Sequence, residues 1–394
     1  MPPCPARLLW DTGGLWSLMT LEAAWQRGLA LEPISAAQIA TGGLEGASLL
    51  VVPGGWSARK KAALGSLGAT AIERFVCHSG TYLGFCGGAG LALSVDDGLG
   101  LVPLDRASGA QRLPGLSGPV KISPCPEARG HPLWRHGETL AAWPVWWPGQ
   151  FSEPDDPSIS VLARYHGPTE ELCAFDLALG QSDPDEVAAR ESDYGVSLDP
   201  APLWGQPAVI EGRYGQGRLL LSYPHLDTPG EQPAGQALER LWRAWLGPEA
   251  PGRPKTPPNA PSPLVGRLAA RCAALWEQGR DLGLWQTRHP VMPLWQRGAR
   301  GLEFYELARL SGALALWAGD DSLDQELEQA LEPILAHGEV VLRAQAALLA
   351  GQEPVAEGAA VQAAWFPRPR RVGGDWAAAR EMLEKALLSL LRNA

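Results

Sequence analysis

The sequence of 394 residues contains no uninterrupted apolar stretch of about 20 residues, the length that a helix needs to cross a bilayer. It has no GxxxxGK[ST] phosphate-binding loop, no CxxC pair and no Cys/His spacing typical of a metal site. These absences exclude a membrane-spanning helix and a P-loop enzyme. We therefore expect no metal and no cofactor.

Positive charge is also scarce, because 33 Lys and Arg face 43 Asp and Glu, for a formal net charge of -10. Binding to phosphate backbones depends on clustered Lys and Arg. The one basic cluster, Arg368, Arg370 and Arg371, lies in a Pro-interrupted stretch and is better interpreted as a solvated loop than as an anion site. We predict a small-molecule ligand, and neither nucleic acid nor membrane as a partner.

Cysteine is used sparingly, with six scattered residues that are typical of reduced thiols. Residues 1–10 show neither a long apolar run nor a cleavage site of small residues, so we expect a cytoplasmic protein. Tryptophan is abundant, with 17 residues against six each of Tyr and Phe. This would suit a site for carbohydrates or quaternary amines, but core packing is the stronger interpretation of most of them.

The length exceeds what one hydrophobic core usually supports, so two domains are expected. Residues 247–263 read GPEAPGRPKTPPNAPSP, and this many prolines sustain neither a helix nor a sheet. We predict an α/β domain over residues 1–246, a Pro-rich linker over 247–263 and a helical domain over 264–394. The helical domain has apolar residues at spacings of three and four in four segments, which predict a bundle of four or five antiparallel helices: 264–281, 301–318, 322–349 and 375–391.

Short apolar runs alternate with helical patterns in the first domain, which is typical of parallel strands joined by crossover helices. Strands are predicted at 7–10, 48–52 and 82–85, and helices at 15–27, 57–67 and 70–78. A hairpin is predicted from 208–214 and 218–222, with its turn at Gly215–Gly217. Residues 117–200 are less regular and are expected to form further antiparallel strands and long loops.

The chemistry is expected at Cys86, within the segment YLGFCGGAGL. A buried strand runs directly into this cysteine, glycines lie two residues before it and two after it, and a helix follows. In a nucleophile elbow, small residues at those two positions let strand and helix approach closely. The start of a helix also favours the thiolate form of cysteine.

Two further segments fit such a site, although each has a simpler alternative. The pair Gly54 and Gly55 ends a buried strand, where its N–H groups could form an oxyanion hole or merely a turn. His225 and Asp227 follow a late strand, where the acid could fix the tautomer of a base that serves the cysteine. A surface histidine near an aspartate is the alternative.

The order of these segments resembles that of the class I glutamine amidotransferase superfamily, and more narrowly the family named after the N-terminal domain of eukaryotic biotin-protein ligases. The matching segments are PGG, GFCGG and GRLLLSYPHLD. The resemblance implies a flavodoxin-like, mostly parallel sheet with flanking helices. It also implies that Cys86 is the nucleophile, His225 the base and Asp227 the third member, with Gly55 and Gly87 in the oxyanion hole. The family usually has Glu where this chain has Asp227, a side chain one methylene shorter.

Ligands of open α/β sheets bind beyond the carboxyl ends of the strands. Besides Gly54, we therefore predict that Asp11, Thr12 and Gly13, which follow the first strand, bind the ligand. Trp146 and Trp147 are also predicted to bind it, because they lie in an aromatic segment similar to one in the family.

Two functions from different classes remain open. One is a Cys-His-Asp amidohydrolase, similar to the glutaminase part of an amidotransferase and acting on a small amide. The other is a non-catalytic protein that binds a small ligand in the same crevice. Biotin ligation is not expected, because no GRGRRG-like segment is present. No chemistry is evident in the helical domain, which leaves self-association or a protein partner as its role.

Overall fold

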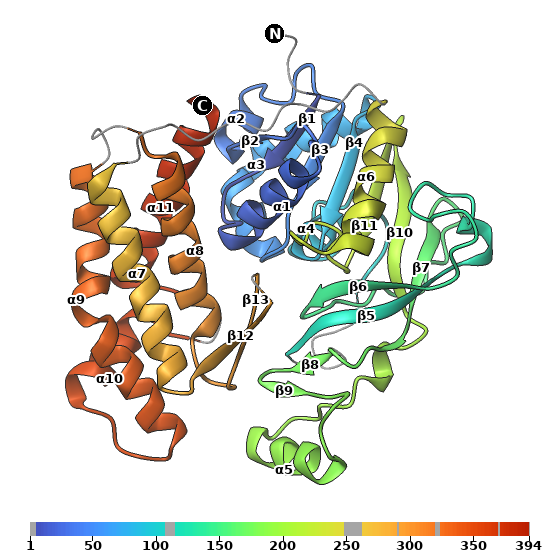
Figure 1. Ribbon diagram of the computed structural model, residues 1–394. Coiled ribbons are helices and arrows are strands. Elements are labelled where there is room, and N and C mark those ends of the chain that lie inside the picture. Colours follow the sequence, from blue (N-terminus) through green and yellow to red (C-terminus); the bar gives the residue numbers. More distant parts are fainter. Residues whose placement is uncertain are drawn as a thin grey trace. The chain divides into compact units, whose positions relative to one another are not determined.

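The structure is a computed structural model that describes residues 5–106, 115–247, 262–289, 291–319, 324–368 and 371–393. The chain divides into two compact units, Met1–Pro254 and Lys255–Ala394 (Figure 1). Of the predicted linker, 247–263, only Gly247, Ser262 and Pro263 lie among the described residues. No described helix is both long and apolar enough to cross a membrane.

The first unit is built on a mixed sheet, in which eleven described strands take part. Five of these strands are parallel and lie side by side in the order β2 (Glu32–Ile34), β1 (Ala6–Leu9), β3 (Leu49–Val52), β4 (Thr81–Phe85) and β11 (Gly217–Ser222). Every residue of β1, β3 and β4 is buried, as expected for strands covered on both faces. This strand order is flavodoxin-like, so the predicted α/β fold is confirmed.

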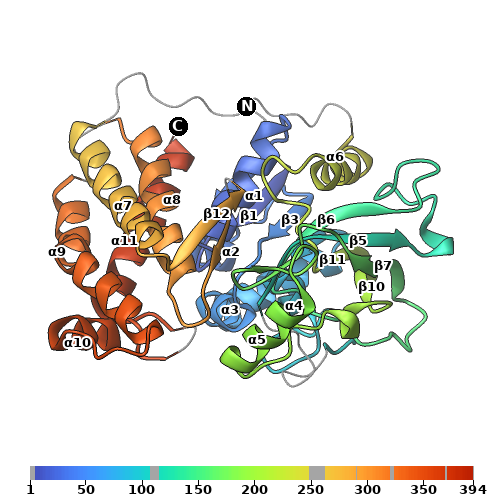
Figure 2. The same ribbon diagram turned by 60° about the horizontal axis from the view of Figure 1, so that its bottom comes forward.

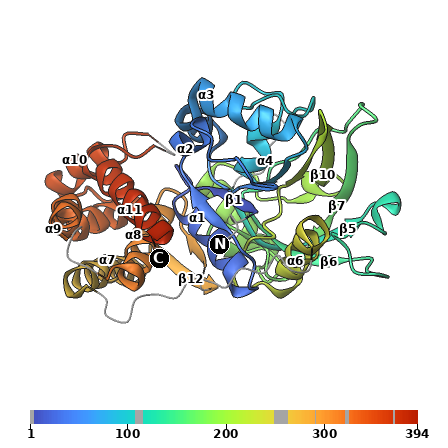
Figure 3. The ribbon, with the colours of Figure 1, turned by 90° about the horizontal axis from the view of Figure 1, so that it is seen from above.

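Helices cover both faces of the parallel strands (Figure 3). Helices α1 (Leu15–Gln26) and α6 (Gln232–Leu246) lie on one face. Helices α2 (Ala36–Ala40), α3 (Ser57–Cys77) and α4 (Gly87–Ala92) lie on the other.

The short elements of this unit differ from the prediction. The two helices predicted over 57–67 and 70–78 form the single element α3, which is interrupted by non-helical backbone at Gly65. Strand β2 and helix α2 were not predicted, because three and five residues are too short to show a period.

The sheet continues beyond β11 with antiparallel strands (Figure 2). Strands β10 (Pro207–Tyr214) and β11 form the predicted hairpin, with Tyr214 opposite Gly217. Next come β7 (Ser160–Pro168) and β5 (Leu116–Pro124), and β6 (Ala141–Trp146) pairs with β5. The smaller elements are β8 (Cys173–Ala174), β9 (Leu177–Ala178), the short 3-10 helices Pro126–Ala128 and Ala201–Leu203, and helix α5 (Pro184–Tyr194).

The second unit is the predicted helical bundle, with a hairpin in addition. Helix α7 (Pro263–Asp281) packs on α8 (Gly301–Trp317) and α9 (Asp324–Leu349). Helix α11 (Gly374–Asn393) packs on α8, α9 and α10 (Ala356–Trp365). Strands β12 (Trp285–His289) and β13 (Met292–Trp295) form the hairpin. The hairpin is held by tertiary contacts, since the Trp285 ring stacks on Trp276 at 5.0 Å and its Nε1 donates to the Trp276 carbonyl at 2.9 Å.

Candidate functional site

The candidate site lies at the carboxyl ends of β3, β4 and β11, which are neighbours in the parallel half of the sheet. Cys86 follows β4 directly, and its N–H donates to the carbonyl of Ser222, the last residue of β11, at 2.8 Å. The segment that carries His225 and Asp227 begins at this same point. Residues far apart in the sequence are thus brought to one edge of the sheet.

Cys86 has the backbone geometry of a nucleophile elbow. Its φ of 46° and ψ of -105° place it among the few described non-glycine residues with positive φ. Such backbone costs about 1–3 kcal/mol and persists only where the surrounding structure enforces it. Cys86 also occupies the N-cap position of α4, without a capping hydrogen bond from its side chain, and the residue is partly exposed.

The glycines that flank the elbow are required by close backbone contacts. A Cβ atom at Gly84 would lie 2.7 Å from the carbonyl oxygen of Gly88, and one at Gly88 would lie 2.1 Å from that of Val52. Both distances are too short for a side chain. The predicted reason for the Gly-x-Cys-x-Gly spacing, close approach of strand and helix, is therefore confirmed.

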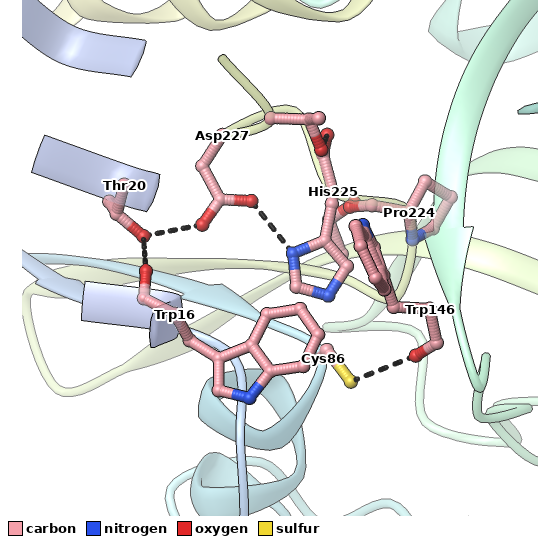
Figure 4. Close-up of polar contacts among 9 residues, drawn as sticks. Trp16, Thr20, Cys86, Trp146, Pro224, His225 and Asp227 are labelled. Atoms are coloured by element: carbon pink, nitrogen blue, oxygen red, sulfur yellow. Dashed lines mark hydrogen bonds and ion pairs between the residues drawn. The ribbon is translucent and has the colours of Figure 1, made fainter. Parts of the chain in front are cut away.

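His225 and Asp227 form a buried pair, at 0% and 1% exposure (Figure 4). Nδ1 of His225 lies 2.9 Å from Oδ1 of Asp227. The other carboxylate oxygen, Oδ2, lies 2.5 Å from the hydroxyl of Thr20 in α1. The backbone N–H of His225 donates to the carbonyl of Pro144 at 2.8 Å, which fixes the main chain at this point.

Two opposing effects set the pKa of His225. Burial opposes protonation, but the charge and the hydrogen bond of Asp227, followed by the interaction with Cys86, outweigh it. The pKa of His225 is therefore raised from 6.5 to about 10. The pair favours an imidazolium that faces a carboxylate.

The ring edge of His225 that carries Nε2 faces the Cys86 thiol (Figure 4). Nε2 is buried and has no hydrogen-bond partner of normal geometry among the described residues. The Cys86 sulfur lies 3.8 Å from the carbonyl oxygen of Trp146.

The two predicted oxyanion-hole residues are in contact. A Cβ atom at Gly87 would lie 1.8 Å from the carbonyl oxygen of Gly55, so the main chains meet where neither residue has a side chain. Neither N–H donates to a backbone carbonyl in the turns, loops and caps of the described chain.

Three tryptophans cluster beside His225. The Trp16 ring stacks on the His225 ring, with centroids 5.2 Å apart and planes at 28°. Trp146 meets Trp16 edge to face at 5.3 Å, and Trp147 does so at 6.0 Å. Gly54 leaves room for the imidazole, because a Cβ atom there would lie 2.6 Å from Cε1 of His225.

The remaining predicted ligand-binding residues have other contacts. The carboxylate of Asp11 accepts a hydrogen bond from the Ala36 N–H at the start of α2, and burial raises its pKa. Gly13 forms the tight entry to α1, where a Cβ atom would collide with the Ser17 hydroxyl at 1.8 Å. The Thr12 carbonyl does lie close to Gly55, 3.8 Å from the position of a Cβ atom.

Trp16 and Thr20 were not predicted as site residues. They are four residues apart in α1, and hence on one face of the helix. A threonine one turn after a tryptophan, in the helix that follows the first strand, was the available signal. Among the residues that the structure describes, no group of three or more His, Cys, Asp or Glu could hold a metal ion.

Several solved structures are similar to part of this chain, whereas no curated protein sequence matches it. A cold-adapted β-galactosidase from Rahnella sp. R3 is 13% identical, with a TM-score of 0.36 over 62% of this chain and only 32% of that enzyme. A protein designated as part of a GMP synthase, from Thermoplasma acidophilum, is 12% identical, with a TM-score of 0.38 over 61% of this chain and 93% of that one. A ThuA-like protein from Bacteroides uniformis is 10% identical, with a TM-score of 0.39 over 63% and 92%.

One sequence family matches, and it is described as biotin-protein ligase, N terminal. The match covers residues 16–94, which include Trp16, Thr20, Gly55 and Cys86 but neither His225 nor Asp227. Over residues 16–94 this chain is therefore similar to the N-terminal family of biotin-protein ligases, as its sequence predicts.

Proposed function

We propose that this protein is a cysteine-dependent amidohydrolase that acts on a small amide through Cys86, His225 and Asp227. The observation that carries the proposal is the buried His225–Asp227 pair beside the strained Cys86 elbow, with Nδ1 and Oδ1 2.9 Å apart. A buried carboxylate that fixes the tautomer of an imidazole next to a thiol is the arrangement on which cysteine nucleophiles depend.

The reaction would begin from a Cys86 thiolate paired with the His225 imidazolium, and the thiolate would attack the amide carbonyl. The N–H groups of Gly55 and Gly87 would stabilise the oxyanion. The imidazolium would then protonate the leaving ammonia or amine, which gives a thioester. Water, deprotonated by the same imidazole, would hydrolyse the thioester and restore the thiol.

A non-catalytic ligand-binding protein is the second candidate. It is favoured by the distance of 3.8 Å between the Cys86 sulfur and the Trp146 carbonyl, because a thiol that donates to a carbonyl is not activated by the base. Both candidates place the ligand at the same strand ends.

Alkylation with iodoacetamide separates the two. The amidohydrolase proposal predicts that Cys86 reacts at pH 6–7 at least about tenfold faster than Cys77, since a neighbouring imidazolium makes a cysteine a better nucleophile. Cys77 is a suitable internal control because it is free and more exposed than Cys86. Rates would be measured by mass spectrometry of peptides.

The variant His225→Gln should bring Cys86 down to the rate of Cys77. A parallel assay would measure ammonia release from a panel of primary amides by the wild type and by Cys86→Ser. Equal alkylation rates at Cys86 and Cys77 would contradict catalysis and favour ligand binding.

A further inference from the structure

Among the described residues, two side chains form hydrogen bonds with the Asp227 carboxylate, and they belong to His225 and Thr20. Thr20 lies outside the predicted Cys-His-Asp set. Its hydroxyl lies 2.5 Å from Oδ2 of Asp227 and 2.9 Å from the carbonyl oxygen of Trp16 (Figure 4). A hydroxyl has one proton, and a carboxylate accepts it more strongly than an amide carbonyl does. Thr20 therefore donates to Asp227.

The carboxylate of Asp227 is thereby held at both oxygens, by His225 at Oδ1 and by Thr20 at Oδ2. Thr20 is 2% exposed and Asp227 is 1% exposed, so water cannot reach the carboxylate to replace the hydrogen bond from Thr20 or from His225. An aspartate with only one oxygen bound could rotate about its last side-chain torsion, which has a broad energy minimum. The second hydrogen bond removes that freedom.

The same helix face also restrains the imidazole. Trp16 precedes Thr20 by one turn of α1, and its ring stacks on His225 at 5.2 Å. One helix thus sets the orientation of the carboxylate and of the ring plane together.

We propose that Thr20 is a positioning residue, which holds Asp227 against His225 and extends the predicted set to the chain Thr20–Asp227–His225–Cys86. This role rests on the proposed function, in which His225 serves the Cys86 thiol. Thr20 touches no reacting atom, and it acts through Asp227.

The test follows His225 directly, by NMR titration of protein labelled at the histidine Cε1 carbons. The chain has seven histidines, and His225→Gln would assign the signal. In Thr20→Val the Oδ2 atom loses its donor, so the carboxylate is free to rotate away from the ring, which removes negative charge from the neighbourhood of His225. We expect the pKa of His225 to fall by about one unit or more in Thr20→Val, and to stay near its wild-type value in Thr20→Ser.

Ser17→Ala provides a matched control, because Ser17 is a fully buried hydroxyl of the same helix that donates to the Trp10 carbonyl at 2.9 Å. It should leave the His225 titration unchanged. If Thr20→Val does not fold, Thr20→Ala takes its place with the same expectation. A wild-type titration in the folded variant without the hydroxyl would overturn the role of Thr20. Slow alkylation of wild-type Cys86 would instead count against the proposed function, and the titration would still decide the role of Thr20.

Discussion

At the scale of single residues, the site depends on a charge pair removed from water. His225 and Asp227 are almost fully buried, and each is held by partners in addition to the other, namely Pro144 and Thr20. Burial of such a pair costs free energy unless the remaining donors and acceptors are satisfied. Nε2 of His225 is buried without a hydrogen-bond partner among the described residues, and it is the atom that the proposed mechanism uses.

The raised pKa of His225 makes the stability of the protein depend on pH. The pKa of His225 is about 10 in the folded state, above the ordinary histidine value of 6.5 that applies to the unfolded chain. The protonated His225 therefore stabilises the folded protein fully below about pH 6.5, and this contribution is lost as the pH rises toward 10. Urea unfolding should therefore show the free energy of unfolding falling between pH 7 and pH 10 by at least about 1 kcal/mol more in the wild type than in His225→Gln. Replacement of the exposed His78 by Gln is the control, and it should retain the wild-type slope.

The substitution Asp227→Glu tests whether the site can accommodate the longer acid that the similar family usually has at this position. The shorter carboxylate reaches His225 at 2.9 Å, so the missing methylene leaves no gap. An additional methylene in this buried site would displace the carboxylate from Thr20, His225 or both. Asp227→Glu should therefore destabilise the protein by about 1–3 kcal/mol and slow alkylation of Cys86. Faster alkylation with unchanged stability would show that the site tolerates the longer acid.

At the scale of elements, the elbow joins β4 to α4 through backbone contacts that exclude side chains. Gly88→Ala would place a methyl group 2.1 Å from the Val52 carbonyl oxygen, and should cost about 2–4 kcal/mol in denaturant unfolding. Gly130→Ala is the matched control, because a Cβ atom there meets nothing within 4 Å. Its cost should stay within about 0.5 kcal/mol. Equal effects of the two substitutions would contradict the close approach of strand and helix.

The elements that the sequence predicted are those with a strong local pattern. Strands β1, β3 and β4 are short apolar runs that are buried throughout, and the β10–β11 hairpin has a glycine-rich turn. Helix α5 was not predicted because it buries no residue and therefore has no apolar face. Its start is fixed by a local signal instead, the Asp183 carboxylate that caps the helix.

At the scale of the whole molecule, the chain divides into two compact units, and we expect them to unfold as separate events. Leu310 is fully buried in α8, so Leu310→Ala should destabilise the helical unit by about 2–5 kcal/mol. Calorimetry should show one transition shifted by Leu310→Ala and a different one shifted by Gly88→Ala. The alkylation rate of Cys86 should be unchanged in Leu310→Ala. A single transition whose midpoint temperature is lowered by both substitutions would contradict separate unfolding of the two units.

The sequence by itself determined the α/β fold of the first unit, the helical character of the second and the elbow at Cys86, because each of these is encoded by neighbouring residues: apolar runs, helical periods and glycines at fixed spacing. It also indicated His225 and Asp227 as a pair, since they are two positions apart. The contacts of Trp16 and Thr20 with that pair were decided only by the tertiary structure. Thr20 and Asp227 are 207 positions apart in the chain, and no local pattern encodes which buried hydroxyl meets a distant carboxylate when a helix packs against a sheet.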